Sequence, residues 1–283
     1  MIPVQFVAMV RAEMLKVFTR GSGIGALIVA VLVGVLAAAL MAGLQNLQGG
    51  VQINGQAAIM QFDVVGVGAK ALYARNFFIL PLLLFLATAG AMAGEHADRT
   101  LRELAVRPVP RWSILAAKFC ALASLSLATL VLTFVTSGLF GWPLVGGPGI
   151  DQSVAEGSES ILRLAMGFGA SFVSDLCLIA LGLALSTFVQ SVGGVVVSLM
   201  LVLMADRGLW MGLNGLNLVQ KMMGNPEGQP WVTEALKWTL VGAQACWEGW
   251  ESQFEPGQFL AVTVYTVAAC AVAVLRFSRS DVP

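Results

Sequence analysis

Long apolar stretches dominate this sequence and limit what it can fold into. Six of them are long enough to cross a bilayer core of roughly 30 Å, which takes about 17–25 helical residues. They lie near residues 22–44, 76–93, 114–140, 162–189, 192–209 and 257–276. Only 11% of the 283 residues are charged, against about 25% in ordinary soluble domains, so the chain cannot cover a water-facing surface. We therefore predict an all-α, polytopic integral membrane protein whose six transmembrane helices form one domain, residues 1–283.

The basic residues are distributed unevenly between the two sides of this topology. An even number of spans places both termini on one side, and ten of the sixteen Lys and Arg residues fall on that side. Because cytoplasmic loops carry an excess of Lys and Arg, we expect both termini in the cytoplasm. The membrane that we expect is a bacterial inner (cytoplasmic) membrane. The net charge of zero gives no basic surplus for a nucleic-acid partner.

Residues 1–21 precede the first span and predict an amphipathic helix. Plotted at 100° per residue, Gln5, Glu13, Lys16 and Arg20 share one face, and most of the apolar side chains share the opposite face. We favour a helix that lies in the inner membrane interface, in contact with lipid headgroups. The alternative is an ordinary cytoplasmic helix packed on other protein.

A charged segment, residues 94–113, separates the second and third predicted spans. Thr100 and Glu103 have the spacing of a helix-capping box, Pro108 ends the short helix that they begin, and a new helix starts near Arg111. The pattern predicts a short, rigid cytoplasmic helix at the mouth of two spans. Such a helix is suited to receive force from a soluble partner.

The residues of this segment resemble the coupling segment in permease subunits of ATP-binding-cassette transporters of the ABC type 2 family. In that family the segment reads as an acid, Gly-Thr-Leu, then Pro-Val-Ser-Arg, and a Lys in the next helix. The matching residues are Glu95, Thr100, Leu101, Leu104, Pro108, Val109, Arg111 and Lys118. Two positions depart from the pattern, because Arg99 stands in place of Gly and Pro110 in place of Ser.

The resemblance implies an N-terminal interfacial elbow helix, a cytoplasmic coupling helix between spans two and three, and two kinds of protein partner. These are a cytoplasmic ABC ATPase and a second permease chain, in a homodimer or a heterodimer. The implied ATPase-coupling residues are Glu95, Asp98, Thr100, Leu101, Glu103, Leu104, Arg107, Pro108, Arg111 and Lys118. The implied function is ATP-driven transport by alternating access, with export favoured.

No GxxxxGK[ST] phosphate-binding loop occurs in the sequence. We therefore expect this chain to be no enzyme by itself and to bind no cofactor, with ATP and Mg on the partner ATPase. The four cysteines form no CxxC or Cys/His pattern, and we predict neither a metal site nor a disulfide framework.

Asp175 is the one acid that lies well within an apolar stretch. An ionisable group at the bilayer centre costs about 2.5–3.5 kcal/mol on insertion scales unless it faces protein or water. The sequence leaves three roles open for it: lining a substrate path with Ser171 and Ser174, relaying protons, or bonding to Ser or Thr on another span.

Two segments on the expected outer side are less regular. Residues 45–76 are polar and Gly-rich, which suggests an extended loop or a partly re-entrant hairpin. Residues 210–256 carry five of the seven tryptophans, which predicts short re-entrant or interfacial helices with an aromatic belt among membrane lipids. The alternative for these tryptophans is an aromatic substrate-binding surface.

Other function classes have weaker support from the sequence. An integral membrane enzyme would need a reactive constellation, and neither HExxH nor GxSxG occurs. An ion-coupled secondary transporter would depend on Asp175 alone. A membrane component of a larger envelope or motility assembly, driven by an ABC ATPase, stays open as a variant of the permease hypothesis.

Overall fold

The computed structural model describes residues 3–48, 52–53, 56–57, 64–76, 80–97, 110–145, 157–223, 229–241 and 256–279. Over these residues the chain is almost wholly helical, which confirms the all-α prediction. The exceptions include short turns and the two-residue strands β1 (Gln52–Ile53) and β2 (Gln56–Ala57), which form one antiparallel pair.

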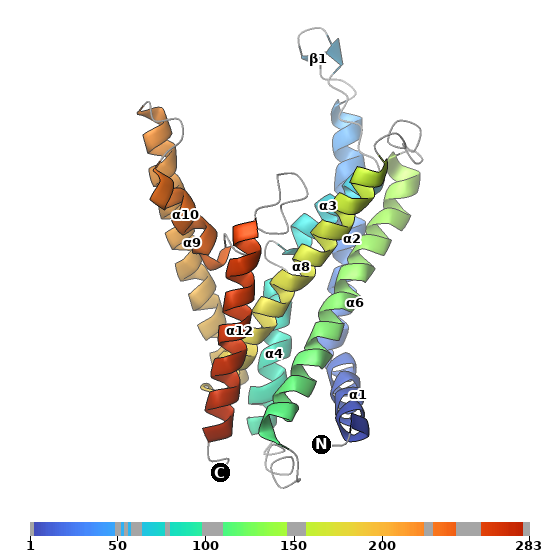
Figure 1. Cartoon of the computed structure of the whole chain (residues 1–283). Helices are drawn as coiled ribbons and strands as arrows, with labels where there is room; N and C mark the ends of the chain where they lie inside the picture. Colours follow the sequence, from blue (N-terminus) through green and yellow to red (C-terminus); the bar gives the residue numbers. More distant parts are fainter. Residues whose placement is uncertain are drawn as a thin grey trace.

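The helices run back and forth between two ends of the molecule. In chain order they are α1 (Pro3–Thr19), α2 (Gly21–Gln48), α3 (Val64–Ala74), α4 (Leu80–Ala97), α6 (Arg111–Val145), α8 (Gly157–Ser186), α9 (Val192–Met222), α10 (Pro230–Trp238) and α12 (Pro256–Arg279). α2, α6 and α9 lead away from the end at which α1 lies, whereas α4, α8 and α12 lead back to it (Figure 1). We call this end, which holds α1 and the last turn of α12, the terminal end.

Five of the described helices are long and apolar enough to cross a membrane. The qualifying segments are Gly21–Leu44, Arg111–Leu144, Ala165–Ser186, Val192–Gln220 and Gly257–Arg279. They correspond to five of the six predicted spans. The remaining span, predicted near 76–93, falls on α4, whose apolar part is the shorter helix Pro81–Glu95.

Two parts of residues 45–76, the segment predicted to be an extended loop or a partly re-entrant hairpin, are helical rather than extended. α2 continues to Gln48, and α3 packs against α2 and α6 with Val67 and Ala71 fully buried. The glycines that suggested a loop allow close packing instead, because a Cβ at Gly68 would lie 2.5 Å from the ring of Phe134 on α6. Small residues let membrane helices approach closely.

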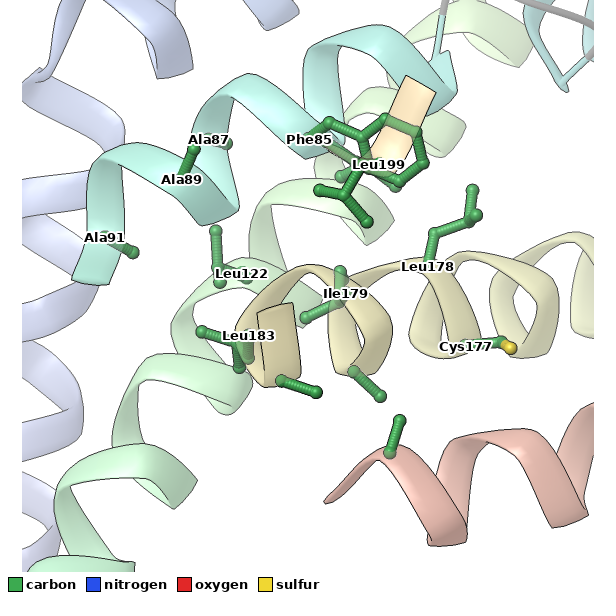
Figure 2. Packing of buried hydrophobic residues seen from close by; sticks show 14 of the residues in the cluster. Phe85, Ala87, Ala89, Ala91, Leu122, Cys177, Leu178, Ile179, Leu183 and Leu199 are labelled. Carbon is green, nitrogen blue, oxygen red and sulfur yellow. The ribbon is translucent and has the colours of Figure 1, made fainter. Parts of the chain in front are cut away.

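The core lies where α4, α6, α8 and α9 meet. Figure 2 shows part of this buried cluster, which includes Phe85 of α4, Leu199 of α9, and Leu178 and Ile179 of α8. α4 approaches α8 closely because its buried face is rich in alanine, and a Cβ at Gly182 would lie 2.8 Å from the Cβ of Thr88. This packing fixes α4 at the centre of the helix bundle.

α9 extends 13 residues beyond its predicted end at residue 209. The short helix α10 follows it, and the carboxylate of Asp206 accepts hydrogen bonds from the backbone N–H groups of Leu240 (2.8 Å) and Val241 (2.6 Å). The hydroxyl of Tyr265 on α12 donates to the carbonyl of Trp238. These bonds hold the end of α10 against α9 and α12; its place relative to the membrane interface stays a prediction.

Candidate functional site

Three of the predicted ATPase-coupling residues fall within the described chain. Glu95 lies near the last turn of α4, Arg111 is the first residue of α6, and Lys118 follows two turns later. The other seven, Asp98, Thr100, Leu101, Glu103, Leu104, Arg107 and Pro108, lie outside the described residues. α4 ends and α6 begins at the terminal end of the molecule (Figure 1).

Five charged side chains from three helices gather at this end, and we call them the terminal charge cluster. They are Glu13, Lys16 and Arg20 in and just after α1, Glu95 on α4, and Lys118 on α6. On α1 their spacing is i, i+3 and i+7, which places them on one helix face. The cluster thus connects the N-terminal helix to the two helices that flank residues 98–109.

Lys118 is the centre of the cluster. Its Nζ lies 2.7 Å from Oε2 of Glu95 and 3.0 Å from Oε2 of Glu13, and its side chain is 0% exposed. The Nζ of Lys16 bridges the other carboxylate oxygens, at 3.1 Å from Glu13 and 3.2 Å from Glu95. Buried charges persist when they are paired and hydrogen-bonded, and each of these two carboxylates contacts both lysines.

The protonation of two members of the cluster follows from these contacts. Burial raises the pKa of Glu13, but attraction to Lys118 and hydrogen bonds from Lys118 and Lys16 outweigh it, and the pKa stays below its ordinary value. Burial lowers the pKa of Lys16, but attraction to Glu95 and Glu13 raises it above its ordinary value. Both groups are therefore charged at neutral pH.

Arg20 and Arg111 extend the polar contacts of the terminal end. Arg20 donates from Nη1 to the backbone carbonyl of Gly90 on α4, at 2.5 Å, and its Nη2 lies 3.9 Å from Oε1 of Glu95. Arg111 donates from Nη1 to the carbonyl of Phe277 near the end of α12, at 3.2 Å. Both flanks of residues 98–109 are thereby connected to the helices around them.

A second charge network lies within the bundle, around Asp175 on α8. Its Oδ2 accepts from Nη2 of Arg75 at 3.0 Å and from the hydroxyl of Ser126 on α6 at 2.5 Å. Nη2 of Arg75 also donates to Oγ1 of Thr129 at 3.0 Å. Arg75 and Asp175 are each 2% exposed, so the pair joins the end of α3 to α6 and α8 out of contact with solvent.

The structure places the three residues predicted for a substrate path close together on α8 but buries them. Ser171 accepts a hydrogen bond at 2.9 Å from Nδ2 of Asn76, and Ser174 is 5% exposed. Among the alternatives left open for Asp175, bonding to a hydroxyl on another span matches its contact with Ser126. Whether these residues line a substrate path stays a prediction.

Sequence reasoning missed Arg75 and the role of Glu13. Arg75 falls within residues 45–76, the polar segment predicted for the outer side, but its side chain is buried, because Asp175 supplies its counter-charge. The signal that could have found it is an arginine next to an apolar stretch in a chain with one isolated intramembrane acid. Within the described ranges, no group of three His, Cys, Asp or Glu side chains is placed to hold a metal ion.

We compared the sequence with models of known protein families and with curated proteins. The family model described as ABC-2 family transporter protein matches residues 9–204, which is more than half of the chain. The matched region begins within α1, ends within α9, and includes both charge networks. No curated protein matches the sequence. The long apolar helices and this match together show that the chain is a multi-pass membrane protein and belongs to the ABC-2 family of transporter proteins.

Proposed function

We propose that this chain is the permease subunit of an ATP-driven exporter and that residues 98–109 dock a cytoplasmic ABC ATPase. The observation that carries the proposal is the position of Glu95 and Arg111, which hold the two ends of this segment at the terminal end of a chain in the ABC-2 family. The sequence has no phosphate-binding loop of its own, so the energy must come from a partner.

The proposed topology places the terminal end in the cytoplasm of a bacterium, with the inner membrane around the bundle. α6 supports a full crossing, because Trp112 and Trp142 near its two ends are each 53% exposed. Their separation of 30 residues corresponds to about 45 Å of helix, which is the thickness of a bilayer with its headgroups. Tryptophan is enriched at both membrane interfaces.

The sixth crossing would be made by α3 and α4 together. α4 has 18 residues, or about 27 Å of helix, and the packing of α3 on α2 and α6 continues the chain along the bundle. This arrangement gives an even number of crossings and keeps both termini at the terminal end. α1 would lie along the inner interface, since Val7 and Leu15 on it are exposed at 65% and 59%.

In the proposed mechanism, closure of the ATPase pushes residues 98–109 and thereby the bases of α4 and α6. α4 lies at the centre of the core, so a displacement of its base would be passed to α8 and α9. A second permease chain would complete the substrate path. The apolar surfaces of α9 and α12 suit contact with either lipid or that second chain. Ion-coupled transport has less support, because the charge of Asp175 is already compensated by Arg75 at 3.0 Å.

The experiment is a mild-detergent pull-down of the tagged chain from its native membrane, with mass spectrometry and an ATP-hydrolysis assay on the eluate. We expect a P-loop ATPase in stoichiometric amount. Leu101→Asp and Leu104→Asp should remove it, because apolar contacts in the segment supply most of the docking affinity. The matched control is Gln229→Asp, an exposed residue at the opposite end of the molecule.

A wild-type chain that elutes stable, monodisperse and free of any ATPase would contradict the proposal. Retention of the ATPase by both segment variants would instead contradict the assignment of residues 98–109 as its docking site.

A further inference from the structure

We infer that Glu13 and Lys118 are positioning residues that lock α1 to both flanks of residues 98–109, so that the N-terminal helix moves with the coupling segment as one unit. The inference rests on the proposed function. The inference extends the proposed function in two ways: α1 is part of the element that transmits force, and the contacts that lock α1 in place are ionic.

The first argument is where the members of the cluster lie along the chain. Glu95 lies three residues before residue 98, and Lys118 lies two helical turns after Arg111. A contact between Glu95 and Lys118 at 2.7 Å therefore joins α4 and α6 close to the ends from which residues 98–109 depart. Any displacement of the segment reaches this contact within two turns of helix.

The second argument is that α1 supplies half of the counter-charge for Lys118. The carboxylate of Glu13 lies 3.0 Å from Nζ of Lys118 and is 105 residues away in sequence. Because the ammonium is fully buried, loss of either carboxylate leaves an imperfectly compensated charge in a dry environment. The joined ends of α4 and α6 are therefore more stable together with α1 than apart from it.

The third argument is that the lock holds two separate points of α1. Lys16 reaches Glu95 at 3.2 Å, and Arg20 at the α1–α2 bend donates to the carbonyl of Gly90. Val17 between them is 5% exposed and packs into the hydrophobic core. Contacts at successive turns prevent α1 from pivoting about its connection to α2, so α1 follows α4 and α6.

The consequence for the transporter is a division between docking and transmission. The cluster belongs to α1, α4 and α6 and includes no residue of the docking segment itself, so its loss should leave the ATPase bound. It should, however, free α1 from α4 and α6, and the movement of the segment would no longer be passed to the helix that lies along the membrane interface.

The test uses the intact permease–ATPase complex, reconstituted in lipid vesicles after replacement of the native cysteines. Spin labels at Val7→Cys on α1 and Trp112→Cys on α6, both exposed positions, report the distance between these helices. The distance is measured by pulsed electron paramagnetic resonance without nucleotide and with ADP–vanadate trapped on the ATPase. In the complex with the cluster intact we expect one narrow distance that shifts by less than about 2 Å between the two states, smaller than a one-turn displacement.

Glu13→Gln keeps the shape of the side chain and removes its charge. We expect this variant to retain the ATPase at normal stoichiometry, with a broadened α1–α6 distance that now depends on nucleotide. Lys118→Met should also broaden the α1–α6 distance and make it depend on nucleotide. If the Lys118→Met chain does not assemble with the ATPase, the result for Glu13→Gln alone decides the test. Arg11→Gln is the matched control, an exposed charge on the same helix, and should leave the distance unchanged.

Two results would overturn the inference while the ATPase stays bound. One is an α1–α6 distance that changes with nucleotide in the intact complex, and the other is a Glu13→Gln complex that keeps a narrow, nucleotide-independent distance. A wild-type chain that retains no ATPase would contradict the proposed function itself, which distinguishes the two failures.

Discussion

Buried charges set the energetics of this protein at the scale of single residues. Asp175 and Arg75 compensate each other in the bundle, and Lys118 is compensated by two carboxylates at the terminal end. In each case the partners come from different helices, so the ion pair also specifies which helices are neighbours. Removing one partner costs more than the pair contributes, because the remaining charge stays buried.

For Asp175→Asn we expect a loss of unfolding free energy of about 3–5 kcal/mol, because the guanidinium of Arg75 loses its counter-charge. The measurement is reversible unfolding of the purified chain in mixed micelles, followed by tryptophan fluorescence. Ser171→Ala is the control, since it removes one hydrogen bond from Asn76 and should cost about 1 kcal/mol. Unchanged stability of Asp175→Asn together with altered transport would argue for the substrate-path role instead.

The lowered pKa of Glu13 predicts how the terminal charge cluster responds to acid. A carboxyl whose pKa is lowered on folding contributes stability above its ordinary pKa of 4.5 and loses that contribution as the pH falls through its folded-state pKa. The difference in thermal stability between the wild type and Glu13→Gln should therefore be constant from pH 5 upward and should shrink below 4.5. A difference that persists unchanged into strong acid would contradict the ion pair between Glu13 and Lys118.

Some of these residues could be predicted from sequence and others could not. Asp175 was visible because it interrupts an apolar stretch, and Lys118 because it fits a family pattern. Arg75 was hidden at the border of a polar segment. Glu13 was assigned to a polar helix face, but nothing local indicates a partner 105 residues away. Local patterns report which residues are unusual, whereas their partners depend on how the helices pack.

At the scale of elements, the apolar stretches predicted the long helices well and their ends less well. The predicted apolar stretch ends at residue 209, but residues 210–222 are also helical, and α9 continues to Met222. The sequence did not predict α3, because the glycines in residues 45–76 suggested a loop. Among the described glycines, those that approach another helix most closely include Gly34 and Gly182.

The α2–α6 contact gives a prediction at this scale. A Cβ at Gly34 would lie 2.7 Å from the carbonyl oxygen of Thr133, and Oγ1 of Thr133 donates to the carbonyl of Ala30 at 3.2 Å. Gly34→Ala should therefore destabilise the chain by about 1–3 kcal/mol, since the two backbones must separate. Gly25→Ala on the same helix meets nothing within 4 Å and should be neutral or stabilising. Equal effects in an unfolding titration would exclude close α2–α6 packing at Gly34.

At the scale of the whole molecule, both termini of the described chain lie at one end, and the last turn of α9 and the start of α10 lie at the other (Figure 1). The even number of predicted spans implied that both termini share one end. That the terminal end lies in the cytoplasm stays a prediction.

Reporter fusions test that orientation. Alkaline phosphatase needs an oxidising compartment to form its disulfides. We expect it to be active when fused after Gln229 and inactive when fused after Arg279, with a cytoplasmic fluorescent reporter giving the reverse pattern. Active phosphatase at Arg279 would place the terminal end outside and would be incompatible with docking of a cytoplasmic ATPase there.

The pairing of Arg75 with Asp175 also has a consequence for biosynthesis. The two residues are 100 positions apart, so at about 5–20 residues per second the ribosome completes Asp175 about 5–20 s after Arg75. During this interval Asp175, which pairs with the guanidinium in the folded chain, is absent from the nascent chain. The α3–α4 segment must therefore stay near water or the insertion machinery until α8 arrives, and insertion of this helix pair is expected to finish after that of later helices.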